Sequence, residues 1–272
     1  MIYKLYAPSP LLNEYVKFYH LLHFDLRGRS IPPTKVYFPH AEQCLTFDPR
    51  GRVTGLNRDT ERQQRRSFSY LSRQQTSVYD LKFDEDYVML KVVFQPGGLF
   101  RLFGTPLRKL GNDYVDADAV IPGVRHVNDQ LANAITYEQM VGVVDRFLIS
   151  RTSKAKPLLP FDKVLKMLDA GNPFQSIDWV ASQACLSVRQ LERKYDERIG
   201  VSPMLYHRIV RFNKAFSIKE KNPSLSWFTI ALTCGYSDLS HLIKDFKQLA
   251  GSTPSQLAQE EAYSIHRQLN LV

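Results

Sequence analysis

The pattern of apolar and polar positions changes near residue 152, from a strand-like half to a helical half. Before that point, short runs of aromatic and β-branched residues alternate with breaks rich in Pro, Gly and Arg, which is typical of strands. Because these runs cluster instead of alternating with helices, they favour a mostly antiparallel sheet or a small barrel. The predicted strands are Val36–Phe38, Cys44–Phe47, Phe68–Leu71, Val78–Phe83 and Tyr87–Phe94.

Two further segments of this half have apolar residues at helical spacing, and we predict helices at Leu11–Leu22 and Tyr137–Ile149. GRVTGLNRD, near residues 51–59, carries turn chemistry. Residues 150–160 are polar and then carry two prolines, which is typical of a linker. The fold class that follows is α+β. We predict a barrel-like N-terminal domain with flanking helices over residues 1–152 and an all-helical domain over residues 153–272.

The helical half contains an internal repeat with an offset of 51 residues from its leucine onward. The matched positions are Ala181, Ser187, Leu191, Arg193, Tyr195, Gly200, Ser202 and Pro203 in the first copy, and Ala231, Ser237, Leu242, Lys244, Phe246, Gly251, Thr253 and Pro254 in the second. The first serine of each copy can cap a helix, and the leucine and the aromatic residue lie on one apolar face. The basic residue between them is left exposed. The glycine ends the helix in the left-handed region, and Ser/Thr-Pro begins the next one.

Each copy therefore predicts two helices joined by a short turn. The expected helices are Ile177–Ala184 and Val188–Ile199, then Trp227–Thr233 and Leu239–Leu249, with a connecting helix from Pro203 to Glu220. This is the helix-turn-helix arrangement, whose second helix enters the DNA major groove. The connecting helix spans about 27 Å, close to the ~34 Å of one DNA turn. An α-solenoid or protein-docking bundle is the alternative, but two copies are fewer than the three or so that a solenoid needs.

The exposed faces of the two second helices carry side chains suited to DNA. Basic and amide groups read guanine and adenine edges and neutralise phosphates. The first face has Arg189, Gln190, Arg193 and Lys194, and the second has Ser240, His241, Lys244 and Lys247. The whole chain has 36 Lys and Arg against 27 Asp and Glu, a net charge of +9. Both halves of the chain have this basic excess, so charge does not distinguish the C-terminal half. The prediction of DNA binding therefore rests on the repeat.

Residues 158–257 closely resemble the DNA-binding domain of the AraC/XylS family of transcriptional regulators. The resemblance rests on WVASQACLSVRQLERKYDERIGVSPMLYHRIVRF and on IALTCGYSDLSHLIKDFKQLAGSTPSQL. It implies two helix-turn-helix units that insert into successive major grooves. The residues it implies for base contact are Arg189, Glu192, Arg193, Ser240, His241 and Lys244, to which we add Gln190. We expect phosphate contacts from Ser187, Lys194, Arg198 and Lys247.

The N-terminal half is similar to the sensor domains found upstream in one branch of this family. The similarity rests on LLNEYVKFYH and on VVFQPGGLFRLFGTP at residues 92–106. It implies a cupin-like barrel with added helices that senses a small molecule or mediates dimers. Tyr37, Phe38 and His40 are the candidate ligand-binding residues. Candidate partners are double-stranded DNA, a small-molecule effector, RNA polymerase and a second copy of the chain.

Other kinds of site are not favoured by the sequence. Cys44, Cys185 and Cys234 are scattered and form no CxxC pair, so we expect free thiols and no zinc site. His20 and His23 have HxxH spacing without a third ligand, and Gln95–Gly98 reads as a strand-ending turn without the lysine of a phosphate loop. We expect no cofactor, no metal and no catalysis. No signal peptide or membrane span is evident, which favours a cytoplasmic protein.

Three alternatives stay open at this point. The helical half could dock a protein while the N-terminal half binds a ligand or acts as an enzyme. A reactive Cys44 could accept alkyl groups from damaged DNA. The Arg-rich segment 50–66, with six arginines, is either a solvated loop or an additional phosphate or dimer contact.

Overall fold

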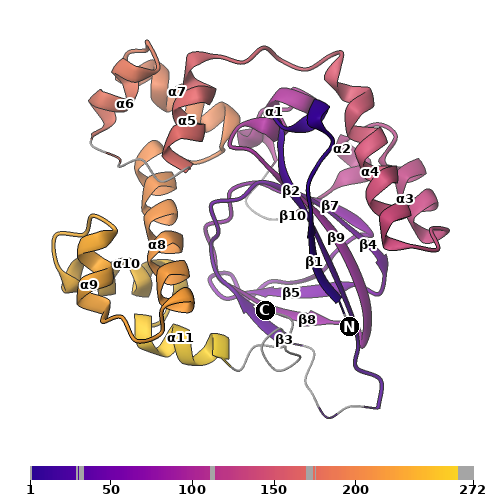
Figure 1. The fold of residues 1–272 in the computed structure, drawn as a ribbon, viewed down its shortest axis with the longest axis horizontal. Coiled ribbons are helices and arrows are strands. Elements are labelled where there is room, and N and C mark those ends of the chain that lie inside the picture. The colour runs from indigo at the N-terminus through magenta and orange to yellow at the C-terminus, as the bar shows by residue number, and fades with distance from the viewer. Residues whose placement is uncertain are drawn as a thin grey trace.

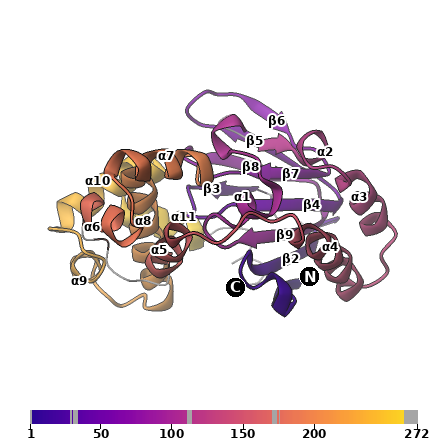
Figure 2. The ribbon, with the colours of Figure 1, turned by 90° about the horizontal axis from the view of Figure 1, so that it is seen from above.

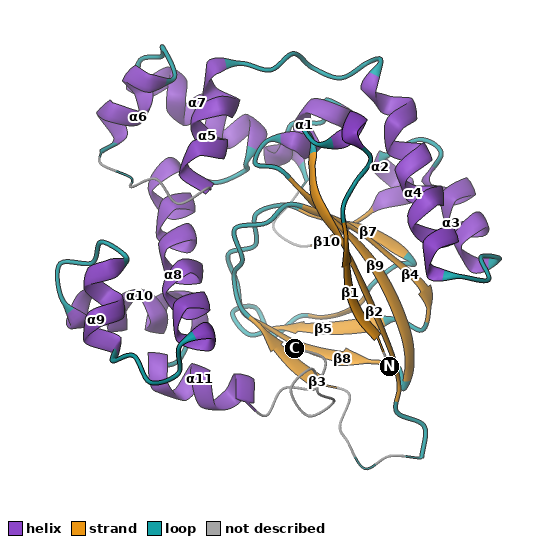
Figure 3. Ribbon diagram, viewed as in Figure 1, coloured by secondary structure: helices purple, strands orange, loops and turns teal. Residues whose placement is uncertain are grey.

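The computed structural model describes residues 2–28, 30, 34–110, 114–169, 174 and 176–262. Strands fill the N-terminal half and helices the C-terminal half (Figure 3), which confirms the α+β class. The strands are β1 (Ile2–Tyr6), β2 (Val16–Asp25), β3 (Thr34–Tyr37), β4 (Cys44–Arg50), β5 (Val53–Asn57), β6 (Gln63–Arg65), β7 (Ser69–Ser72), β8 (Tyr79–Phe83), β9 (Asp86–Phe94) and β10 (Tyr114–Asp116).

Helices flank the strands and form the C-terminal half. The first group is η1 (Pro10–Leu12), α1 (Gly98–Phe103), η2 (Leu107–Lys109), α2 (Ala117–Val120), α3 (Val124–Ala132) and α4 (Tyr137–Thr152). The second group is α5 (Pro160–Asp169), α6 (Ile177–Gln183), α7 (Val188–Arg198), α8 (Pro203–Lys221), α9 (Trp227–Thr233), α10 (Leu239–Ala250) and α11 (Pro254–Ala262). Figure 1 shows α3 and α4 on one side of the strands and the second group on the other.

The strands form two antiparallel sheets, in the orders β1-β2-β9-β4-β7-β10 and β3-β8-β5-β6. All five predicted strands are present, as β3, β4, β7, β8 and β9. Backbone pairing among the described strands forms two separate sheets, which are not joined into one closed barrel. GRVTGLNRD was expected to be turn; most of it is β5, which sits between a turn at Gly51 and another at Asp59.

The predicted helix at Leu11–Leu22 is wrong, because most of that segment is β2. Tyr19 and Leu21 point into the core under the helices, whereas Leu22 and Phe24 belong to the core on the other face of the strand. A strand buried on both faces carries apolar residues without strict alternation. Their spacing then also matches a helix, which explains the error.

The two faces of the six-stranded sheet differ in chemistry. One face is apolar, with Leu45, Leu71 and Leu90 packed together with residues of α1 to α4. The other face carries polar side chains, including Thr46 and Lys91, and looks toward the second sheet. Figure 2 shows the C-terminal helices beside the two sheets.

The C-terminal half has two helical clusters connected by α8. The first contains α5, α6 and α7 around Leu191 and Tyr195, and the second contains α9, α10 and α11 around Phe246. All five predicted helices are confirmed, with ends within one or two residues of the expected ones. Gly200 and Gly251 have φ of 88° and 71° at helix ends, which confirms the predicted left-handed terminators.

The Arg-rich segment 50–66 belongs to β4, β5 and β6 and the turns between them. Arg58 bonds to Asp80 in β8, and Arg65 bonds to Asp84, which directly follows β8. These surface pairs agree with a solvated segment except at its end, where Arg66 is buried, and the alternative roles stay untested. Across the described residues, none of the helices combines the length and apolar character that crossing a bilayer requires.

Candidate DNA interface and cavity

Helix α7 begins at Ser187, whose hydroxyl accepts a hydrogen bond from the backbone N–H of Gln190 at 3.3 Å. The Gln190 side chain accepts in return from the backbone N–H of Ser187 at 2.9 Å. This capping box fixes the helix start, and Leu191 and Tyr195 then turn into the core. The opposite face is exposed and carries Arg189, Gln190, Glu192 and Arg193. The structure therefore brings the predicted base-contacting residues of the first unit onto one helix face.

Helix α10 begins one residue later than its repeat partner. Asp238 caps it by accepting from the backbone N–H of His241 at 2.8 Å, so Ser237 does not take the capping role predicted from the repeat. The extra residue between Ser237 and Leu242 explains the shift. Those backbone hydrogen bonds also lower the pKa of Asp238. Ser240 and Lys244 are exposed, as predicted.

His241 is held differently from its exposed neighbours. Its Nδ1 lies 3.2 Å from the Ser237 hydroxyl, and its Nε2 lies 3.2 Å from Nη2 of Arg211 on α8. The imidazole is half-buried between these two groups. Its orientation is therefore fixed before any partner arrives.

Helix α8 holds the two units at a set distance. Its 19 residues rise about 28 Å at 1.5 Å per residue. Tyr206, near its start, packs in the core of the first unit, whereas Phe212 and Phe216 pack in the core of the second. Asp245 of α10 then accepts hydrogen bonds from Arg208 at 2.9 Å and from Arg211 at 2.9 Å. Both cores and this carboxylate fix α7 and α10 relative to one helix.

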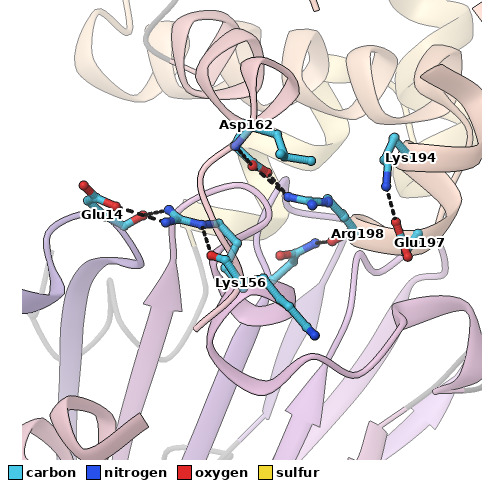
Figure 4. A network of polar contacts seen from close by, with 9 residues as sticks. Glu14, Lys156, Asp162, Lys194, Glu197 and Arg198 are labelled. Carbon is cyan, nitrogen blue, oxygen red and sulfur yellow. Dashed lines mark hydrogen bonds and ion pairs between the residues drawn. The ribbon is translucent and has the colours of Figure 1, made fainter. Parts of the chain in front are cut away.

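Arg198 does not have the position that a phosphate contact requires. It is 4% exposed, and its Nη1 donates to both oxygens of Asp162 on α5 at 2.6 and 2.7 Å (Figure 4). A guanidinium buried on a carboxylate is held inside the fold, so we remove Arg198 from the phosphate-contacting set. Lys194 is half-buried and bonds to Glu197 at 2.9 Å, and Lys247 is exposed.

A cavity of about 460 Å³ lies between the two sheets. One row of paired residues crosses its wall, from β2 through β9 and β4 to β7: His20, Lys91, Thr46 and Tyr70. His20 and His23 lie on opposite faces of β2, because side chains alternate along a strand. Only His20 lines the cavity, which separates the two histidines of the HxxH motif.

Charged groups in the cavity wall are mostly paired. Lys91 donates to Glu42 at 2.9 Å. Burial alone would raise the pKa of Glu42, but the ammonium of Lys91 outweighs burial and lowers that pKa to about 2. Burial and the same ammonium lower the pKa of His20 to about 3, so its imidazole is neutral at pH 7.

The three cysteines are free. Burial raises the pKa of Cys44 to about 12, which keeps the thiol protonated and therefore unreactive. This argues against the alkyl-acceptor alternative.

Comparison with known proteins identifies the helical half. A family model described as a helix-turn-helix domain matches residues 180–260. The HTH-type transcriptional regulator MtrA of Neisseria gonorrhoeae is 28% identical over 97 residues, and the HTH-type transcriptional regulator ArgR of Pseudomonas aeruginosa is 28% identical over 109 residues. These matches cover 36% and 40% of this chain and 32% of each relative. The C-terminal domain is an AraC-type helix-turn-helix domain, similar to the domains of these regulators.

Solved structures and a second family model extend the comparison to the strand-rich half. A structure of ToxT from Vibrio cholerae aligns with 89% of this chain and 97% of its own at 12% identity and a TM-score of 0.49. A regulator with an AraC-type DNA-binding domain from Chromobacterium violaceum aligns with 39% of this chain and 93% of its own, at 25% identity and a TM-score of 0.34. A model of a domain of unknown function (DUF6597) matches residues 4–116.

The AraC-type domain supplies part of the cavity wall. Phe216, Ser217 and Glu220 of α8 line the cavity beside the strands. Glu261 of α11 also lines it and bonds to Lys35 of β3 at 2.8 Å. The helix that connects the two helix-turn-helix units is therefore in contact with the cavity.

The segment after β3 joins the two halves of the molecule. Phe38 packs edge-on against Phe212 and Phe216 of the AraC-type domain, with ring centroids 5.5 and 5.1 Å apart. Asn213 donates to the Pro39 carbonyl at 2.8 Å and accepts from the Ala41 N–H at 2.7 Å. These contacts couple α8 to the strand-rich half.

Tyr37, Phe38 and His40, the predicted ligand-binding residues, all line the cavity. His40 stacks on Tyr37 and on Phe38, with centroids 4.9 and 4.7 Å apart. Sequence reasoning missed Glu42, Arg66 and Lys91 in the same wall. A signal existed for Lys91, which is the single charge inside the apolar run YVMLKVVF.

Proposed function

We propose that this protein is a sequence-specific DNA-binding transcriptional regulator whose DNA affinity responds to a small molecule held between the two sheets. Residues 153–272 form the DNA-binding domain and residues 1–152 the sensor domain. The observation that carries the proposal is the pair of capped helices α7 and α10, each with an exposed polar face, connected by α8. The relatives' names as transcriptional regulators support it.

The base-contacting residues of this proposal come from both helices. They are Arg189, Gln190, Glu192 and Arg193 on α7, and Ser240, His241 and Lys244 on α10. Ser187, Lys194 and Lys247 are the phosphate contacts. Arg193 and Lys244 occupy equivalent positions of the repeat, so each is assigned to the centre of its own half-site.

The effector acts through α8. A ligand in the cavity touches a wall that α8 shares, and α8 also sets the spacing of α7 and α10. A ligand that binds one arrangement of this helix better than another shifts the population toward that arrangement. Structures of ToxT from Vibrio cholerae have been solved with an unsaturated fatty acid and with a substituted butenoic acid bound.

The proposed role also predicts the location and the partners of the protein. A DNA-binding regulator works beside the chromosome in the cytoplasm. RNA polymerase and a second copy of this chain are the proposed protein partners. The proposal includes no enzymatic activity.

Arg193→Ala and Lys244→Ala test the proposal. Each removes a side chain that can donate to guanine O6 and N7, so each should cost ~1–3 kcal/mol of discrimination at one base position. The measurement is competition between the preferred duplex and a random duplex. Arg125→Ala, an exposed arginine on α3, is the matched control and should leave discrimination unchanged. Unchanged discrimination in the α7 and α10 variants as well would reject the assigned base contacts.

A further inference from the structure

Arg66 is a buried cation in the wall of the cavity. It is 5% exposed, and its guanidinium lies over the ring of Tyr114, 3.3 Å from the centroid. Nη1 reaches the Tyr70 hydroxyl at 3.5 Å. Nε and Nη2 are buried and have no hydrogen-bond partner among the described residues. Buried donors without partners are costly, so this edge of the guanidinium calls for an acceptor.

Two other arginines of this chain use Nε and Nη2 to bind a carboxylate. Nε and Nη2 of Arg58 donate to the two oxygens of Asp80, at 2.9 and 2.6 Å. Nε and Nη2 of Arg27 bind the two oxygens of Asp25 in the same way. Two parallel N–H groups match the geometry of a carboxylate. Arg66 lines the cavity, and the same two donors of its guanidinium are buried and unpaired among the described residues.

The other cations of the cavity wall already have carboxylate partners. Lys91 is paired with Glu42 at 2.9 Å and Lys35 with Glu261 at 2.8 Å. Asp48, whose charge acts on Arg66, accepts instead from the Tyr87 hydroxyl at 2.8 Å, and burial raises its pKa to about 8. Among the described residues, Asp48 makes no hydrogen bond or ion pair with Arg66.

The remaining residues of the wall indicate the chemistry of the uncharged part of a ligand. Aromatic rings line it from both sheets, including Phe18, Tyr70, Phe83 and Tyr114, with the hydroxyls of Thr46 and Ser72 between them. A volume of about 460 Å³ lies within the range of small-molecule sites. A two-point donor can bind a carboxylate or a phosphate, but because the other cations of the wall are already paired, the single guanidinium suits a singly charged carboxylate better than a phosphate of higher charge.

We propose that the effector is a small aromatic carboxylic acid and that Arg66 binds its carboxylate through Nε and Nη2. This inference rests on the proposed function only in calling the ligand an effector; the binding site itself stands on the cavity.

Calorimetric titration of the full chain tests the site without DNA. The probes are 4-hydroxyphenylacetate and indole-3-acetate, each compared with its neutral amide. Each acid keeps the shape of its amide and adds the charge, so we expect at least one acid to bind about tenfold or more tightly than its amide. Equal binding of acid and amide in both pairs, or no binding by either acid, would overturn the proposal.

Three variants test whether Arg66 is the residue that binds the carboxylate. Arg66→Met should abolish the preference for the acid, and Arg66→Lys should weaken it, because a lysine keeps the charge but loses the two-point geometry. Arg65→Met is the matched control, since Arg65 is the exposed neighbour that pairs with Asp84, and it should keep the preference. A preference that persists in Arg66→Met would refute the assignment. If Arg66→Met does not fold, the comparison of acid and amide on the unmodified chain still decides.

The titration also separates this inference from the proposed function. Binding of the acid without any DNA binding by the full chain would keep the site and remove the effector role. Specific DNA binding with no acid preference would keep the regulator and reject the aromatic acid.

Discussion

Buried carboxylates determine what several arginines of the C-terminal half do. Asp162, 3% exposed, binds Arg198 and also accepts from the backbone N–H of Leu159 at 2.8 Å (Figure 4). Asp245, 2% exposed, binds Arg208 and Arg211. An arginine that looks like a surface phosphate contact in the sequence becomes a structural clamp when a buried acid lies opposite. The acid comes from a different helix, so its position depends on the packing.

Asp162→Ala should destabilise the fold by about 3–5 kcal/mol, because it leaves the buried guanidinium of Arg198 without its partner. The free energy of unfolding in urea measures this loss. Lys194→Ala breaks a more exposed pair with Glu197 and should cost under about 1 kcal/mol. Equal losses in the two variants would contradict the structural role of the buried pair.

Asp48 predicts a pH dependence of stability. Its folded pKa of about 8 lies above the ordinary value of 3.8 because of burial. The folded chain therefore holds a proton that the unfolded chain loses, and stability should fall as pH rises from about 4 to about 8. Asp48→Asn keeps an acceptor for Tyr87 and should flatten this part of the profile. Urea unfolding across that range compares the two chains, and identical slopes would show that Asp48 ionises normally.

At the scale of elements, start and stop signals determine the helices of the repeat. Ser187, Ser202 and Ser226 each cap a helix by accepting from a backbone N–H three residues on. Gly200 and Gly251 end helices with a positive φ. These signals act over a few residues, which is why the boundaries of α6 to α10 could be predicted from the sequence.

Ser187→Ala should cost about 1 kcal/mol of stability, because the first turn of α7 loses its side-chain cap. Thermal or urea unfolding of the full chain measures the change. Ser182→Ala, an exposed position in α6, should be nearly neutral. A neutral effect at Ser187 would mean that packing alone fixes the start of α7.

The strand-rich half was less predictable, for a physical reason. Strand β2 buries both faces, so the spacing of its apolar residues did not distinguish a strand from a helix. The cavity depends on pairing between distant strands, such as Lys91 of β9 with His20 of β2 and Thr46 of β4. Tyr37, Phe38 and His40 could be named because they are adjacent in sequence. Arg66 could not, because only the second sheet brings it to the same wall.

The whole molecule is connected through α8. Residues of this helix take part in the cores of both helix-turn-helix units, and Phe216, Ser217 and Glu220 of the same helix line the cavity. Figures 1 and 2 show the helices of the C-terminal half along one side of the sheets. In the proposed function, a ligand in the cavity would act on α7 and α10 through this single helix.

The most direct test of the account is binding of the purified full chain to duplexes selected from a random library, compared with scrambled duplexes at several salt concentrations. We predict a preference of about a thousandfold or more at physiological salt. Affinity should also fall steeply as salt rises, because phosphate contacts release counterions. Equal affinity for selected and scrambled duplexes, or binding that does not change with salt, would contradict a sequence-specific DNA-binding regulator.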